Sequence, residues 1–120
     1  MVPIELFTEI LDELAAELPE ELFHELNLGI NISEDEKRHP AARQDDLFIL
    51  GEYFHAQMGR GIVIYYGSFA RVHGDMSAEE LRNELRRTLR HEFRHHMEGR
   101  AGERGLEIED ERQLREYLGQ

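Results

Sequence analysis

The chain has 120 residues, 14 Lys and Arg against 26 Asp and Glu, and no Cys, which gives a formal net charge of −12 at pH 7. Its length suits one domain, so we expect a single domain over residues 1–120. The negative charge repels nucleic-acid phosphates and anionic lipid surfaces, which argues against nucleic-acid and membrane partners. Without Cys, disulfides and a Cys nucleophile are excluded, and any bound metal must use His, Asp or Glu.

The N-terminal segment is acidic where a signal peptide needs basic residues, and no apolar stretch approaches the ~20 residues of a membrane span. We therefore expect a cytoplasmic protein. The charge is unevenly distributed, because residues 1–36 hold 11 acids and no Lys or Arg. We expect this acidic face to be solvated or to pair with an Arg-rich face elsewhere in the chain.

The N-terminal part of the chain predicts two helices and a strand. Residues 4–18 carry apolar side chains at a three-to-four spacing with acids between them, which is typical of an amphipathic helix. Pro19 ends this helix and suits the first position of a short second helix over residues 20–26. Apolar and polar residues then alternate over residues 28–33, which predicts a half-buried strand, and a polar loop follows over residues 34–46.

Two buried strands and a long helix are predicted next. The apolar runs at residues 47–50 and 62–66 are bordered by glycines, which is typical of buried strands. Ser77 is placed to cap a long helix, and a Glu three residues later completes a capping box. We expect this helix to end near Met97, before a series of glycines, and a last short helix to span residues 109–118.

The long helix carries a metal-binding pattern. At 100° per residue, its apolar face and its Arg-rich face occupy two sectors, and His91 and His95 share a third sector that borders the core. Two imidazoles four residues apart on one helix can bind the same metal ion. With Glu92 between them, residues 91–95 match the H-E-x-x-H pattern of zinc hydrolases.

Each residue type in this pattern has a chemical reason. Neutral imidazole nitrogens bind Zn²⁺ at about 2.0 to 2.1 Å, and a catalytic site has three protein ligands and a water in the fourth position. Zinc lowers the pKa of that water to about 7, and a carboxylate such as Glu92 can take its proton as general base. We expect one Zn²⁺ per chain, bound by His91 and His95.

The order of these segments resembles the small bacterial zincin-like metallopeptidase family. The resemblance rests on the acidic first helix, Leu-Pro-Glu-Glu-Leu at residues 18–22, Leu-Gly-x-Tyr at 50–53, the apolar run at 62–66 and His-Glu-Phe-Arg-His-His at 91–96. It covers nearly the whole chain. It implies an α+β fold of the minimal zincin type, in which a short mixed sheet packs on the active-site helix between N- and C-terminal helices. It also implies a peptide or protein substrate.

The same resemblance implies Asp110 as the third zinc ligand. Residues 108–112 resemble the family's Asp-bearing segment, although an insertion precedes them here. Glu98 stands where the family has a Gly, and it projects beside the two histidines, so it is an alternative as a ligand or as an acceptor for an imidazole N–H. Glu103 and Glu107 are further alternatives within reach of the site.

The remaining His and Tyr residues receive structural interpretations. His96 lies on the apolar face of the helix, and we expect a buried or hydrogen-bonded histidine rather than a ligand. The other histidines have no partner at ligand spacing, and we expect them on the surface or in loops: His24, His39, His55 and His73. Tyr65 and Tyr66 are expected in the core, with one phenol at the site as the alternative.

The sequence therefore predicts a zinc-dependent peptide hydrolase with Glu92 as general base. A second hypothesis is a module that binds zinc and a peptide or protein with little or no catalysis, because 120 residues leave little room for a deep cleft. A third hypothesis, an acidic partner-binding protein with accidental histidines, predicts no tight metal binding.

Overall fold

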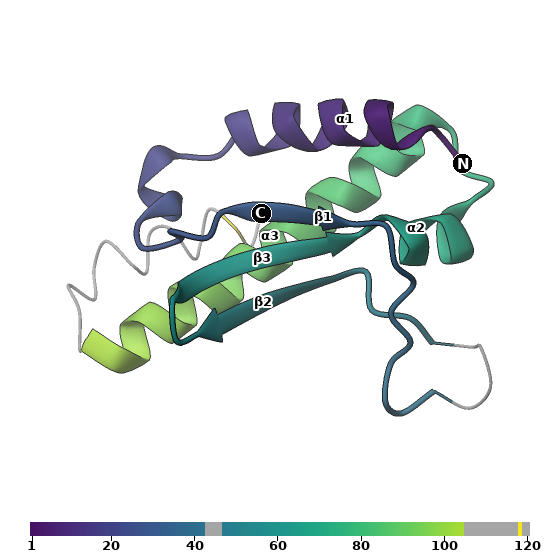
Figure 1. The fold of residues 1–120 in the computed structure, drawn as a ribbon. Coiled ribbons are helices and arrows are strands. Elements are labelled where there is room, and N and C mark those ends of the chain that lie inside the picture. The colour runs from purple at the N-terminus through teal and green to yellow at the C-terminus, as the bar shows by residue number, and fades with distance from the viewer. Residues whose placement is uncertain (43–46, 105–117, 119–120) are drawn as a thin grey trace.

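The computed structural model describes residues 1–42, 47–104 and 118. In chain order the elements are α1 (Ile4–Ala16), the 3-10 helix η1 (Glu20–Phe23), β1 (Ile30–Ser33), β2 (Gly51–Ala56), β3 (Gly59–Tyr65), α2 (Tyr66–His73) and α3 (Ala78–Arg104), as Figure 1 shows. These residues form an α+β fold with three α-helices and a three-stranded mixed sheet. Within this described part, no helix is both long and apolar enough to span a membrane.

The sheet is built around β3, which lies between the other two strands. It pairs in parallel with β1, where Ile30 is opposite Ile62, and antiparallel with β2, where Tyr53 is opposite Ile62. The central place suits β3 because its β-branched Ile62 and Ile64 are fully buried. Among the described residues, β2 is consequently an edge strand, with β3 as its one neighbour in the sheet.

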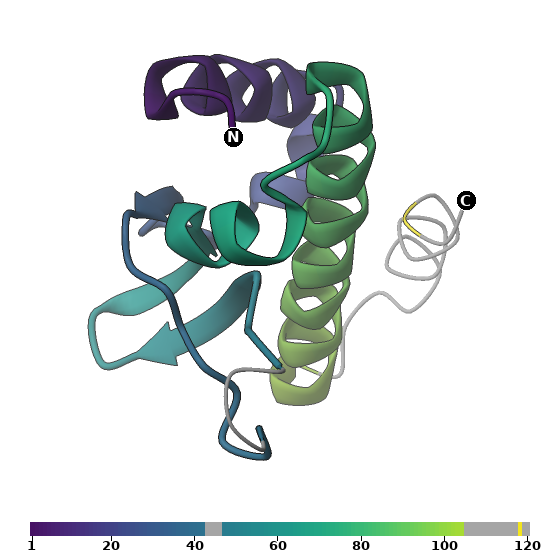
Figure 2. The same ribbon diagram turned by 90° about the vertical axis from the view of Figure 1, so that its right-hand side faces the viewer.

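The core lies where α1, α3 and the sheet meet, and Figure 2 shows α1 across the N-terminal half of α3 with the sheet to one side. α3 buries one apolar stripe in this core: Leu81, Leu85, Leu89, Phe93 and Met97. α1 contributes a second stripe: Phe7, Ile10, Leu11 and Leu14. Phe7 also contacts the rings of Tyr66 and Phe69 edge-on, with centroids 5.1 and 5.5 Å away, which anchors α2.

The capping box predicted for the long helix is confirmed. The Glu80 N–H donates to the Ser77 hydroxyl over 3.2 Å, and the Ser77 N–H donates to the Glu80 carboxylate over 3.1 Å. The bond from the Ser77 N–H lowers the pKa of the Glu80 carboxyl group, and the Ser77 hydroxyl lowers it further. The helix is longer than predicted, because it continues through Gly99 and Gly102 to Arg104. A helical Gly costs only about 1 kcal/mol relative to Ala, which the surrounding turns can offset.

Other predictions differ from the structure. The short helix predicted over residues 20–26 is a 3-10 helix that spans only Glu20–Phe23. Residues 47–50 form no strand, since Phe48 makes only an isolated bridge with Arg38, and the strand begins at Gly51 instead. β2 is half-buried and partly polar. It is therefore a strand because it pairs with β3, and its apolar content alone does not reveal it. The helix α2 was not predicted. It begins at Tyr66, which was expected to be the last residue of the strand over residues 62–66. The predicted last helix, over residues 109–118, falls outside the described residues except for Leu118.

We predict that Gly67→Ala destabilises the protein by about 1 to 3 kcal/mol, because overpacking a tight contact forces the backbone to shift. A Cβ at Gly67 would lie 2.5 Å from the Glu34 carbonyl oxygen. Gly99→Ala is the matched control, because its Cβ would meet the Tyr53 hydroxyl at an ordinary 3.5 Å. Urea unfolding of both variants measures the difference, and an equal loss of stability would contradict the prediction.

Candidate metal centre

His91 and His95 lie one turn apart on the exposed side of α3. Their Nε2 atoms are 3.1 Å apart, and their rings stand at 85° to each other. Two nitrogens bound to one tetrahedral zinc ion are about 3.3 Å apart, given the usual zinc–nitrogen bond length. Burial lowers the pKa of His91, and the charges of His95 and Arg94 lower it further, which favours the neutral ring that metal binding requires. This pair fits a shared metal ion.

Glu92 lies between the two histidines in sequence but points toward the sheet. Its residue is 6% exposed, and its Oε1 atom accepts a hydrogen bond of 2.8 Å from the Tyr53 backbone N–H. Burial raises the pKa of Glu92 to about 7, the Tyr53 hydrogen bond opposes this rise, and the charge of Glu52 adds to it. A carboxyl group with a pKa near neutrality can both accept and return a proton, as a general base must.

The two histidines and Glu92 line one open cleft of about 720 Å³ between α3 and β2. His91, Glu92 and His95 line it from the helix, and Gly51 and Tyr53 line it from the edge strand. The structure therefore brings the three residues of the predicted H-E-x-x-H pattern to one hollow beside a strand edge. Such a hollow has room for an extended chain next to the two histidines.

Asp110, the predicted third ligand, lies outside the residues that the structure describes. In the described part of the chain, no group of three His, Asp or Glu side chains is arranged to hold a metal ion. Glu107 also lies outside the described residues, as does the side chain of Glu103. Glu98 lines the cleft, and its Oε2 is 4.0 Å from Nδ1 of His95, the ring nitrogen that does not face His91. This position suits an acceptor for an imidazole N–H better than a ligand.

Sequence reasoning missed several residues of the cleft, and Tyr53 and His39 are the two that carry polar side-chain groups of interest. Tyr53 lines it, whereas Tyr65 donates its hydroxyl to Glu52 over 3.3 Å and Tyr66 donates to the Val2 carbonyl over 2.6 Å. Neither Tyr65 nor Tyr66 is among the residues that line the cleft. His39 is exposed as predicted, but it also lines the cleft. The spacing of residues along the chain contains no signal for either contact.

The prediction that His96 is a core histidine is confirmed. Its side chain is fully buried, with Nε2 2.6 Å from the His24 carbonyl oxygen and Nδ1 3.1 Å from the Tyr53 hydroxyl. A neutral ring satisfies both contacts, since Nε2–H donates to the carbonyl and Nδ1 accepts the Tyr53 hydroxyl proton. Burial lowers the pKa of His96 to about 4, with a smaller opposing effect from the His24 carbonyl. Tyr53 thereby contacts Glu92 through its backbone and His96 through its side chain.

No model of a known protein family matches the chain, and no curated protein matches it either. A solved structure does match, that of a conserved hypothetical protein (TTHA0227) from Thermus thermophilus, with 32% sequence identity and a TM-score of 0.75. The match covers 84% of this chain and 99% of the Thermus chain. The two proteins belong to one family. Because the description of the Thermus protein names no activity, the match supports the α+β fold, and the function rests on the chemistry of the cleft.

Glu92 and His96 predict two opposite pH dependences of stability in the metal-free protein. Folding raises the pKa of Glu92 from 4.5 to about 7, so its contribution to stability is lost as pH rises through this range. Folding lowers the pKa of His96 from 6.5 to about 4, so its contribution is lost as pH falls through that range. Each effect amounts to roughly 3 kcal/mol, at about 1.4 kcal/mol per pKa unit.

Urea unfolding with chelator present, between pH 4 and pH 8, would separate the two effects. Relative to the wild type, Glu92→Gln should gain stability as pH rises, while His96→Gln should gain stability as pH falls. Gln at position 92 keeps an acceptor for the Tyr53 N–H. The difference between the stability curves of Glu92→Gln and the wild type therefore measures the effect of removing an ionisable carboxyl group. Stability curves that stay parallel to that of the wild type at every pH would contradict this account.

Proposed function

We propose that the protein is a zinc-dependent peptide hydrolase with a minimal zincin-like fold, in which His91 and His95 hold the metal and Glu92 is the general base. The observation that carries this proposal is one cleft that joins two imidazole nitrogens 3.1 Å apart with a buried carboxyl group whose pKa is about 7. The mixed sheet packed on α3 supports the zincin-like fold. Asp110 remains our proposal for the third ligand.

The chain's own residues carry the proton transfers of this proposed reaction. When bound, zinc supplies a Lewis acid that polarises a carbonyl group and lowers the pKa of water. Glu92 takes a proton from the attacking water and delivers it to the leaving amine nitrogen. Because Oε1 accepts the Tyr53 N–H, we assign the proton transfer to Oε2 of the same carboxyl group. The Tyr53 bond holds the carboxyl group in one orientation as the proton moves.

The edge strand β2 supports a peptide as the substrate. The Tyr53 N–H donates a hydrogen bond to Glu92 and not to β3. The backbone N–H and C=O of Tyr53 therefore point away from β3, toward the open edge of the sheet. In an antiparallel pair, alternate residues share this direction, and Gly51 and His55 therefore also point outward. An extended peptide can add to such an edge through main-chain hydrogen bonds. It would then run along the cleft, with a carbonyl group beside the histidine pair.

A second candidate is a module that binds zinc and a peptide or protein without cleaving it. One observation favours it, since the described residues supply two metal ligands and a catalytic zinc site needs three. The two candidates share the metal and the cleft. They differ in whether Glu92 moves a proton, so metal content cannot distinguish them, whereas a Glu92 variant can.

We predict one Zn²⁺ per chain after purification without added metal, measured by elemental analysis. The double variant His91→Ala, His95→Ala should lose this metal because both imidazoles are proposed ligands. His55→Ala is the matched control, since His55 is an exposed histidine of β2 that is not among the residues lining the cleft. Equally low metal in the wild type and the double variant would contradict the metal site.

Competitive zinc titration would then identify the third ligand. Changes to residues that only support a ligand weaken metal affinity by about 10- to 100-fold, so loss of a true ligand should cost at least as much. We expect this loss for Asp110→Ala, and a smaller one for Glu98→Ala and Glu107→Ala. An unchanged affinity in Asp110→Ala would remove Asp110 from the site.

We predict that Glu92→Gln keeps its zinc and loses most peptide hydrolysis. General acid–base catalysis contributes about 10²- to 10⁴-fold, so cleavage should fall by that factor. A peptide-library digest followed by mass spectrometry measures it, with chelator-treated wild type as the control. Equal cleavage by the wild type and Glu92→Gln would indicate a contaminating protease, and no cleavage by the zinc-loaded wild type would favour the binding module.

A further inference from the structure

His39 lines the cleft from a third part of the chain, the segment that connects β1 to β2. Pairing within that segment fixes its backbone, because the His39 N–H donates to the Leu47 carbonyl oxygen over 2.9 Å and an antiparallel bridge joins Arg38 to Phe48. The residues after Leu47 lead into β2. His39 is therefore held at one wall of the cleft, while α3 forms another.

A second contact decides which ring nitrogen of His39 carries a proton. Its Nδ1 atom accepts a hydrogen bond of 3.0 Å from the Ala41 backbone N–H. A ring nitrogen that accepts a hydrogen bond carries no proton, so the neutral ring has its proton on Nε2. A histidine that binds a metal through Nε2 needs the opposite tautomer, in which Nδ1 donates. These contacts make His39 a hydrogen-bond donor rather than a metal ligand.

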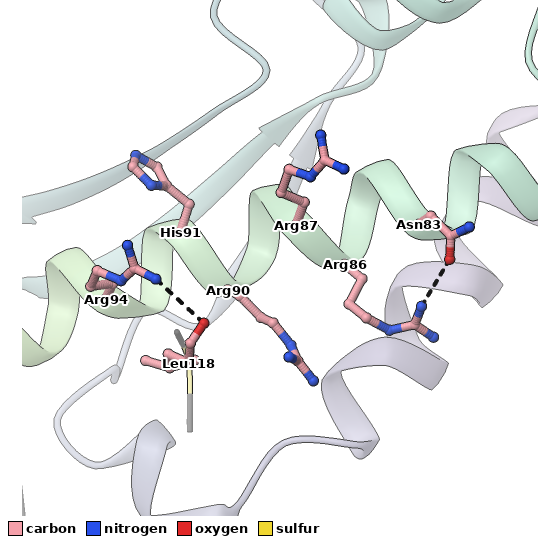
Figure 3. A pocket seen from close by; sticks show the side chains of 7 residues that line it. All are labelled: Asn83, Arg86, Arg87, Arg90, His91, Arg94 and Leu118. Atoms are coloured by element: carbon pink, nitrogen blue, oxygen red, sulfur yellow. Dashed lines mark hydrogen bonds between the residues drawn. The ribbon is translucent and has the colours of Figure 1, made fainter. Parts of the chain in front are cut away.

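The other side chains of the cleft offer no further donor within the described part of the chain. His91 and His95 are the proposed ligands, and the Tyr53 hydroxyl donates to Nδ1 of His96. The remaining lining residues are acidic, apolar or Gly. The arginines of α3, drawn in Figure 3, line a separate hollow that shares only His91 with the cleft. No described residue accepts a hydrogen bond from the Nε2–H of His39, so this donor is available to a substrate.

We propose that His39 is a further catalytic residue, whose Nε2–H donates a hydrogen bond to the carbonyl oxygen of the scissile peptide bond. When water adds to the carbonyl carbon, a C–O bond forms and the π electrons of the C=O bond move to this oxygen. They return when the C–N bond breaks and the amine leaves with the proton that Glu92 delivers. The hydrogen bond is strongest while the oxygen is negative, so it lowers the barrier more than it tightens substrate binding.

This inference rests on the proposed hydrolase function, because the oxygen becomes charged only if the bond is cleaved. The kinetic test uses the peptide that the wild type cleaves fastest in the library digest. His39→Ala should keep its zinc and lose about 10²- to 10³-fold in kcat, the usual effect of removing one oxyanion donor, with a smaller change in KM. His39→Gln keeps a side-chain N–H and should retain part of the activity. His73→Ala is the matched control and should keep the wild-type kcat, since His73 lies on α2 and does not line the cleft.

Two further measurements on zinc-loaded protein do not require cleavage. An NMR spectrum that correlates ring protons with ring nitrogens, assigned with the help of His39→Gln, should place the His39 proton on Nε2. An alanine-rich peptide with a phosphinate in place of one amide carries negative oxygens like those of the transition state. Calorimetry should show this peptide binding at least about tenfold more weakly to His39→Ala, the effect of one charge-assisted hydrogen bond, and equally well to His73→Ala. The parent amide peptide, titrated onto Glu92→Gln with and without His39→Ala, should lose less affinity.

The outcomes separate this inference from the proposed function. Library cleavage that His39→Ala leaves at the wild-type rate, or a His39 ring with its proton on Nδ1, overturns the inference while the hydrolase stands. An equal loss of affinity for the phosphinate and amide peptides also overturns it, because His39 would then bind the substrate without favouring the transition state. Weaker phosphinate binding by His39→Ala with no library cleavage by the wild type supports the hydrogen bond from His39 and rejects the hydrolase.

Discussion

The rotation of α3 about its own axis is the constraint on which the other features depend. Its buried stripe is held against α1 and the sheet, and burying one large apolar side chain contributes about 1.5 to 3 kcal/mol. Because helical residues project at fixed angles, holding this stripe also fixes every other face of the helix. His91 and His95 are then exposed, Glu92 is turned under β2, and the arginines occupy the remaining sector. The arrangement of the candidate site thus follows from core packing.

Tyr53 joins the edge strand to this helix by two contacts of different kinds. Its backbone N–H binds Glu92, and its hydroxyl meets His96, which in turn contacts the His24 carbonyl after η1. Leaving any of these buried polar groups without a partner would cost about 1 to 3 kcal/mol, so the network favours one position of β2 over α3. The last histidine of the His-Glu-Phe-Arg-His-His segment therefore has a structural role, whereas the two before it face the cleft.

The sequence predicted the features that depend on neighbours within one or two turns. The period of α1, the capping box of α3, the central strand and the sectors of the helix all come from local spacing. The bounds of β2, the helix α2 and the places of Tyr53 and His39 were missed, because each depends on contacts between distant parts of the chain. The H-E-x-x-H pattern was visible because both histidines stand on one helix. A third ligand from another segment has no such periodic signal, and Asp110 was inferred by resemblance alone.

The length of α3 has a consequence for how this fold can vary in evolution. Its 27 residues extend for about 40 Å at 1.5 Å per residue, and the core stripe, the histidines and the arginines all share this one rod. Inserting or deleting a single residue between Leu89 and His91 would turn the C-terminal portion by about 100° relative to the core and carry both imidazoles out of the cleft. The connection between β1 and β2 is not part of α3. Natural variation in chain length should therefore accumulate there, while the interval from Leu81 to His95 stays constant.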